Sequence, residues 1–234
     1  MKEKGGFVDM ADLIQVMKEM ASGYTVGTYE DELDAATEDF AESICDQARK
    51  ENLNIFYSYG ATQLCFIDEN NHDYVVKMPF TYKGYCKWEE DENGEEQEEE
   101  VIDDFSYNYT EKTEEIYAKA VDAGVAMFFA GIESIGNGLW KQEYVTERAE
   151  GSSPRIDVIS TEELNYINEL KYENGWGPFD CTWIADCLFY YGRELFDKFI
   201  CFIRKENIND LHSGNYGWTK NGYPRLLDYC GYFE

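Results

Sequence analysis

The sequence predicts an α+β fold in which a helical extension precedes an antiparallel sheet and a second helical region follows it. The chain has 234 residues, enough for one two-lobed domain. Three short segments rich in aromatic and β-branched residues favour consecutive strands. On both sides of them, apolar residues recur at helical spacing. The predicted strands are 54–59, 63–68 and 73–80, and the main predicted helices are 7–21, 30–50, 110–123 and 183–204.

Residues 1–52 form the predicted N-terminal helical extension. Its first helix has apolar residues spaced to form one face, including Leu13 and Met17. The second helix is predicted from about Glu30 to Lys50. Its first turn is rich in acidic residues, which stabilise a helix by interacting with the positive end of the helix dipole.

Residues 53–147 form the predicted sheet-containing lobe, and residues 148–234 form a helical lobe. Gly60 separates the first two strand segments, and a polar turn separates the second from the third, which predicts an antiparallel arrangement. Residues 89–104 interrupt this lobe, and nine of the twelve side chains from 89 to 100 are acidic. Such a run repels itself, so we expect an acidic insertion in the form of a solvated loop.

Net charge and cysteine usage limit the classes of function. The chain carries 20 basic and 48 acidic side chains, a net charge of −28. Such a surface repels nucleic-acid phosphates and anionic lipid and favours solubility or a basic protein partner. Seven cysteines without a Cys-x-x-Cys pair, and only two histidines, predict reduced thiols in a cytoplasmic protein and no zinc site. No apolar run reaches the length of a membrane span or a signal peptide, so we expect no membrane association.

Two polar segments lie near the C-terminus. Asp210-Leu-His-Ser-Gly-Asn215 follows a long apolar helix. Leu226-Leu227-Asp228 comes next, and Asp228 lies thirteen residues after Asn215.

This pair of segments resembles the catalytic and metal-binding loops of the protein-kinase superfamily. Asp-Leu-His-x-Gly-Asn is similar to the catalytic loop of aminoglycoside phosphotransferases, and Asp-x-x-x-x-Asn has the spacing of protein kinases. The resemblance covers about residues 54–231. It implies a two-lobed protein-kinase-like fold that binds ATP and Mg²⁺. Asp210 would then be the catalytic residue, and Asn215 and Asp228 the metal ligands.

The same resemblance assigns roles to residues upstream. Lys77, on the third predicted strand, would contact the ATP phosphates and pair with a glutamate of the following helix. We expect that glutamate to be Glu114, because Tyr117 and Val121 would lie on its inward face, with Glu115 as the alternative. The expected cofactor-binding residues are Lys77, the phosphate-covering turn Gly60, Ala61 and Thr62, and the adenine-binding hinge from Glu143 to Val145.

The resemblance implies a C-terminally truncated member with a reduced C-lobe. Six residues follow Asp228, and the helices that hold the acceptor in protein kinases are missing. The N-terminal helices or a partner would replace them, or acceptor binding has been lost. The expected function is transfer of the ATP γ-phosphate to a hydroxyl of a protein or small-molecule acceptor. The alternatives are a catalytically inactive, nucleotide-binding pseudokinase that acts as an acidic interaction or inhibitor protein, and an unrelated α+β binding protein.

Overall fold

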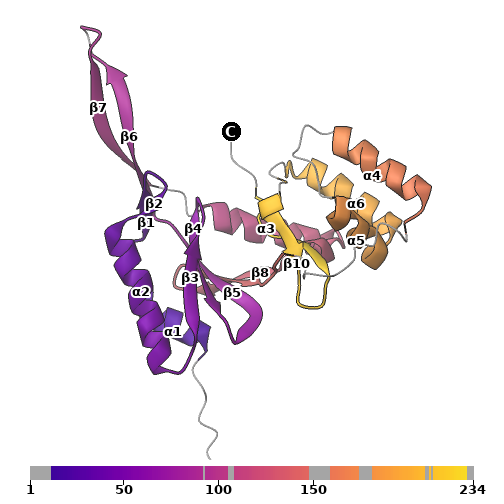
Figure 1. Cartoon of the computed structure of the whole chain (residues 1–234), viewed down its shortest axis with the longest axis horizontal. Helices are drawn as coiled ribbons and strands as arrows, with labels where there is room; N and C mark the ends of the chain where they lie inside the picture. Colours follow the sequence, from indigo (N-terminus) through magenta and orange to yellow (C-terminus); the bar gives the residue numbers. More distant parts are fainter. Residues whose placement is uncertain are drawn as a thin grey trace, which may run out of the picture. The chain divides into compact units, whose positions relative to one another are not determined.

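The computed structural model describes residues 12–91, 93–104, 108–147, 159–173, 181–208, 211 and 213–230. Figure 1 shows an α+β protein, which confirms the predicted class. The chain divides into two compact units. Unit 1 comprises residues 1–107 and 134–141, and unit 2 comprises residues 108–133 and 142–234.

A five-stranded sheet lies mostly in unit 1, and residues 132–133 and 142–143 of its last two strands belong to unit 2. Its strands are β3 (Ile55–Tyr59), β4 (Gln63–Asp68), β5 (Asn71–Pro79), β8 (Ile132–Gly136) and β9 (Leu139–Glu143). Their order is β3-β4-β5-β9-β8. The first three pair antiparallel, with Tyr57 opposite Phe66 and Phe66 opposite Val76, so the predicted succession of three antiparallel strands is confirmed.

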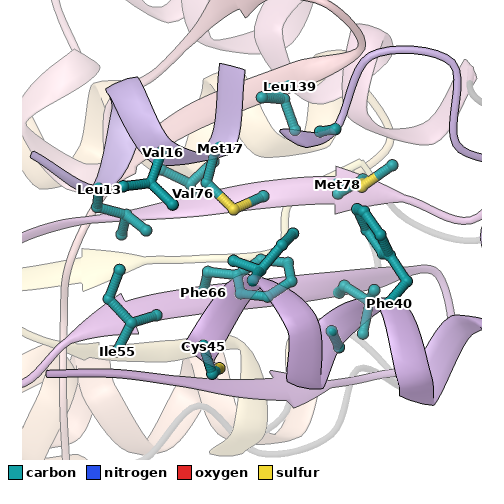
Figure 2. Close-up of a cluster of buried hydrophobic side chains, with 14 of the residues drawn as sticks. Leu13, Val16, Met17, Phe40, Cys45, Ile55, Phe66, Val76, Met78 and Leu139 are labelled. Atoms are coloured by element: carbon teal, nitrogen blue, oxygen red, sulfur yellow. The ribbon is translucent and has the colours of Figure 1, made fainter. Parts of the chain in front are cut away.

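Two helices cover this sheet with their apolar faces. The Asp12 side chain caps α1 (Leu13–Met20), and the Asp34 side chain caps α2 (Ala35–Lys50), each by accepting a backbone N–H. Figure 2 shows apolar side chains of both helices meeting Phe66, Val76 and Met78 of the sheet. The predicted extension is therefore part of the core of unit 1.

The second helix begins five residues later than predicted. Before it lies a hairpin of β1 (Gly27–Tyr29) and β2 (Glu32–Leu33). Its turn residues Glu30 and Asp31 have φ values of 48° and 69°. These left-handed angles are typical of a tight hairpin turn and incompatible with a helix.

The acidic segment forms strands, and the prediction of a loop was wrong. Strands β6 (Tyr82–Glu90) and β7 (Glu96–Asp103) pair antiparallel and complete a second sheet of order β2-β1-β6-β7. The turn between them is well specified, because the Asp91 carboxylate accepts the N–H of Glu95 at 2.9 Å and Gly94 takes a φ of 77°. Lys87 lies opposite Glu99, so part of the charge is balanced across the ribbon.

Unit 2 is mainly helical. Its elements are α3 (Asn108–Asp122), η1 (Ala126–Phe128), α4 (Thr161–Glu173), α5 (Cys181–Tyr191), α6 (Arg193–Lys205), η3 (Ser213–Asn215), β10 (Tyr216–Trp218) and β11 (Pro224–Leu226). Helix α4 begins after Ser160, whose hydroxyl and N–H form a capping box with Glu163. The aromatic core includes a stacked pair, Phe128 and Phe199, with ring centroids 4.5 Å apart.

Two boundaries in unit 2 differ from the predicted ones. The single helix predicted over 183–204 is two helices, because Gly192 has a φ of 78° and interrupts the right-handed backbone. Helix α3 was assigned to the sheet-containing lobe but belongs to unit 2, where Lys119 forms a 2.8 Å ion pair with Glu206. None of the described helices is long and apolar enough to cross a bilayer.

Candidate functional site

The short β10–β11 ribbon brings the two predicted metal ligands together. Tyr216 lies opposite Leu226, and the backbone carbonyl of Asn215 accepts the N–H of Leu227 at 2.7 Å. Asn215 therefore ends η3 directly beside the residue that precedes Asp228. The Asn215 side chain is buried and that of Asp228 is half-buried. Asn215, which has an amide side chain, and Asp228, which has a carboxylate, therefore lie at the same end of the ribbon, offset by one residue in the register.

Gln142 binds the backbone carbonyl of Leu227. This residue was not identified from the sequence. Its Nε2 donates to the Leu227 carbonyl at 2.9 Å, so the backbone of Leu227 is held at both its N–H and its carbonyl. The Gln142 side chain is fully buried, and its Oε1 has no hydrogen-bond partner among the described residues. The residue after Asp228 is held too, because the Tyr229 hydroxyl donates to the Ala130 carbonyl at 2.9 Å.

Arg225 is a second important residue that sequence reasoning missed. Its Nε donates to Glu143 at 2.9 Å, and its guanidinium also donates to the Met127 carbonyl at 2.7 Å and to the Tyr191 hydroxyl. Burial raises the pKa of the Tyr191 hydroxyl, while the nearby guanidinium of Arg225 acts in the opposite direction. A charged residue inside an otherwise apolar strand was the signal that could have drawn attention to it.

The ribbon also meets α5 and the segment after β9. Trp218 Nε1 donates to the buried carboxylate of Asp186 at 2.9 Å. The backbones of Trp218 and Thr146 exchange two hydrogen bonds of 3.0 and 2.8 Å. Gly217 allows this approach, because a Cβ there would lie 2.6 Å from the Thr146 carbonyl oxygen.

Burial also shifts the titration of the residues that follow Asp228. It raises the pKa of the Tyr229 hydroxyl well above its usual value, and the charges of Tyr117 and Asp228 act in the same direction. It raises the pKa of the Cys230 thiol from its ordinary 9.0 to about 11. Both groups are therefore neutral at physiological pH.

The structure places the other predicted catalytic residues in different parts of the chain. Asp210 lies outside the described residues. Lys77 lies in unit 1 on β5, opposite Cys65, with a side chain only 5% exposed. Glu114 lies in unit 2 on α3, where its side chain is half-buried, whereas Glu115 is exposed. The pairing of Lys77 with Glu114 stays a prediction.

The inward face of α3 differs from the one used to choose Glu114. Val121 was predicted to point inward, but its side chain is 54% exposed. The buried residues of α3 include Thr113, Ile116 and Ala120. The predicted apolar stripe therefore extended one residue too far round the helix, since Ala120 is buried and Val121 is exposed.

The predicted phosphate-covering turn joins β3 to β4. The Gly60 N–H donates to the Gln63 carbonyl at 3.1 Å, and the Thr62 carbonyl accepts the Phe80 N–H at 2.9 Å. Gly60 and Ala61 are exposed, and a Cβ added to Gly60 would meet open space. The space beside the Gly60 backbone is therefore open to a ligand, while the two hydrogen bonds hold the turn in place at the end of the sheet.

The predicted hinge begins at the end of β9. The Glu143 N–H donates to the Gly131 carbonyl at 2.8 Å, so this donor is already used inside the protein. Its carboxylate pairs with Arg225. Val145 is buried and lies close to Gly217. An adenine ring would have to use other backbone groups of this segment.

Further searches of the described residues add no second site of this kind. No cluster of three or more His, Cys, Asp or Glu side chains that could hold a metal occurs among them. A pocket of about 510 Å³ in unit 2, with Val125, Cys201 and Phe202 in its lining, contains none of the predicted site residues. A scan of the chain against protein-family models gives no match, and neither does a search of the curated proteins.

Proposed function

We propose that this chain is a protein-kinase-like, ATP-dependent phosphotransferase that transfers the γ-phosphate of Mg-ATP to a hydroxyl of a protein or small-molecule acceptor. The observation that carries the proposal is the 2.7 Å hydrogen bond from the Leu227 N–H to the Asn215 carbonyl, which joins the two loops of the motif. The bond places Asn215 beside the residue that precedes Asp228, and the proposal requires the side-chain oxygens of Asn215 and Asp228 to meet at one metal. In kinases, the residues in this pattern hold the magnesium ions that bridge the ATP phosphates.

The chemistry of these two side chains fits magnesium. Mg²⁺ takes oxygen ligands and is usually bound through one or two protein groups, with water and substrate phosphates completing its coordination. One amide and one carboxylate supply that number. The hydrogen bonds of Gln142 and Asn215 to Leu227 hold the backbone next to Asp228, so little ordering would be needed when the metal binds.

The position of Lys77 also supports the proposal. In kinases, a lysine of the third strand contacts the ATP phosphates. Lys77 lies on the third strand of the unit 1 sheet and is buried there. In chain order, β3, β4 and β5 are followed by the β6–β7 ribbon and then by α3, β8 and β9, so the proposal treats this ribbon as an insertion in the strand and helix succession of the resemblance.

The roles divide between the remaining polar residues as follows. Asp210 would accept the proton of the attacking hydroxyl, since a carboxylate within hydrogen-bond reach is the base that this reaction uses. Asn215 and Asp228 would position the metal, and Lys77 would neutralise phosphate charge. Arg225, with its bonds to Glu143 and Met127, would keep the strand before Asp228 in place.

Thermal unfolding with and without Mg-ATP tests nucleotide binding. A hundredfold excess of ligand over its Kd should raise the Tm by about 5–10 °C for a chain of this size. The Asp228→Asn variant should lose this rise, whereas Asp122→Asn, an exposed change at the end of α3, should keep it. The absence of a rise in the wild-type protein at millimolar Mg-ATP would refute the proposal.

Label transfer from γ-labelled ATP then tests catalysis. The wild-type protein should label itself or an added hydroxyl acceptor, and Asp210→Asn should abolish the transfer while keeping the Tm rise. Binding of Mg-ATP without any transfer or hydrolysis would instead select the inactive pseudokinase function.

A further inference from the structure

The two faces of the β6–β7 ribbon differ in their chemistry. Residues directly opposite each other in an antiparallel pair point to the same face, so the register assigns every side chain. Trp88 lies opposite Glu98, and Cys86 lies opposite Glu100. We call their side the tryptophan face. It consists of Gly84, Cys86, Trp88, Glu90, Glu96, Glu98, Glu100 and Ile102.

The tryptophan face exposes two large apolar side chains. Trp88 is 62% exposed and Ile102 is 69% exposed. Figure 1 shows β6 and β7 extending away from β1, β2 and α2 of the same unit. Exposed apolar groups that share a face with charged ones are typical of surfaces that bind other proteins.

The charge of the tryptophan face has one sign. Its eight residues include four glutamates and no lysine or arginine. The opposite face carries Lys83 and Lys87 besides its three carboxylates, and Lys87 pairs with Glu89. Lys83 also forms a 2.6 Å ion pair with Asp31. The tryptophan face therefore carries more negative charge than the opposite face, and a cationic partner can neutralise it.

Strand β7 is also an edge of its sheet. In the part of the chain that the structure describes, the order β2-β1-β6-β7 leaves no strand on the outer side of β7. Such an edge presents backbone donors and acceptors in the pattern that a further strand requires. A second copy of this chain is a poor occupant, because two β7 edges would bring glutamates against glutamates.

We propose that the outer edge of β7 binds an extended, arginine-rich segment of a partner protein as an additional strand. Alternate arginines of that segment would lie beside Glu98 and Glu100, which can accept bidentate hydrogen bonds from the planar guanidinium group. Their aliphatic stems would cover Ile102, and Trp88, one strand further in, offers its ring to a cation. The glutamates of the tryptophan face favour a basic partner. The unpaired backbone groups along the outer edge of β7 favour a partner segment in an extended conformation.

A labelled peptide of about ten residues that alternates arginine with valine is a suitable probe. Fluorescence anisotropy would measure its affinity for the full-length protein. The double variant Glu98→Gln and Glu100→Gln should weaken binding about tenfold. The matched control Glu89→Gln and Glu99→Gln removes the same charge from the opposite face, and it should weaken binding by less than about threefold. Trp88→Ala should weaken it about fivefold.

Three results would overturn the proposal. One is the absence of peptide binding at millimolar concentration. Another is equal weakening by both double variants, which would indicate unspecific attraction by net charge. The third is undiminished binding of a peptide methylated on alternate backbone nitrogens, because a methylated strand cannot pair with the edge. Circular dichroism of each variant would establish that the protein is folded.

Discussion

The β6–β7 ribbon of unit 1 and the β10–β11 ribbon of unit 2 are both antiparallel pairs, but different interactions hold them. The first has eight pairs in register and is mostly exposed. The second has three pairs and is largely buried. Its backbone and side chains are bonded to Thr146, Asp186 and Glu143, which lie outside the ribbon. The geometry of the β10–β11 ribbon is therefore set largely by contacts with the residues around it. That of the β6–β7 ribbon is set largely by its own turn and strand pairing.

This difference agrees with the two proposed roles. The buried ribbon fixes the backbone beside Asn215 and Asp228, which suits the proposed metal site. The exposed ribbon keeps an open edge, which suits recognition of another chain. Substitutions should therefore cost far more stability in the first ribbon than in the second, and the predictions below test that expectation.

The largest effect is expected for Arg225→Met. The Arg225 side chain is 15% exposed and that of its partner Glu143 is 34% exposed. Removing the guanidinium leaves a partly buried carboxylate without this donor, and the Met127 carbonyl loses its donor too. We expect the free energy of unfolding, measured in urea, to fall by about 3 kcal/mol. The exposed pair offers a control, because Lys198→Met breaks an exposed ion pair with Glu194 and should cost less than about 1 kcal/mol.

The next effect concerns the pH dependence of stability. Burial raises the pKa of the Cys230 thiol to about 11, from an ordinary value of 9.0 that also applies to the unfolded chain. Above pH 9 the unfolded chain ionises this thiol and the folded protein does not, so its contribution to stability is complete below pH 9 and is lost as the pH rises to 11. The wild-type protein should lose about 2 kcal/mol more than Cys230→Ala over this interval. Urea titrations of both proteins at pH 8 and pH 11 measure it, and parallel losses would contradict the assignment.

The sequence was sufficient to predict the elements whose signals are local. The strands around Phe66 and Val76 follow from short runs of aromatic and β-branched residues between turn signals, and the structure contains them. Asn215 lies beside Leu227, the residue that precedes Asp228, and the role of this pair as metal ligands remains a prediction. The roles of Asp210 and Lys77 remain predictions.

Features that depend on distant partners or on backbone conformation were not predictable in this way. Arg225 and Gln142 acquire their roles from residues about 80 positions away in the chain. Gly192 can be tolerated inside a helix, so its left-handed φ, which divides α5 from α6, could not be deduced from the apolar spacing. The acidic ribbon was missed because the mutual repulsion of its charges was weighted above the turn signal of Asp91 and Gly94.

Trp218→Phe should have a smaller effect than the loss of Arg225. The substitution keeps an aromatic ring but removes the indole N–H that donates to the buried Asp186 carboxylate at 2.9 Å. A hydrogen bond to a charged group contributes about 1.5 kcal/mol or more, so the free energy of unfolding should fall by about 1.5 kcal/mol. Trp88→Phe makes the same change in the exposed ribbon and should alter stability by less than about 0.5 kcal/mol. Equal costs for the two tryptophans would remove the distinction between the ribbons.

The smallest effect is expected for Gly94→Ala, at the turn of the exposed ribbon. Gly94 has a φ of 77°, which an alanine adopts at a cost of about 1 kcal/mol. No atom would clash with the added methyl group, so backbone strain is the whole cost. Because the ribbon is held by its own turn and register, we expect this strain to appear as local opening. Hydrogen exchange of the β6 and β7 amides should become about fivefold faster, while the amides of β4 and β5 keep their wild-type rates. Equal acceleration in both sheets would show that the ribbon and the core of unit 1 unfold as a single cooperative element.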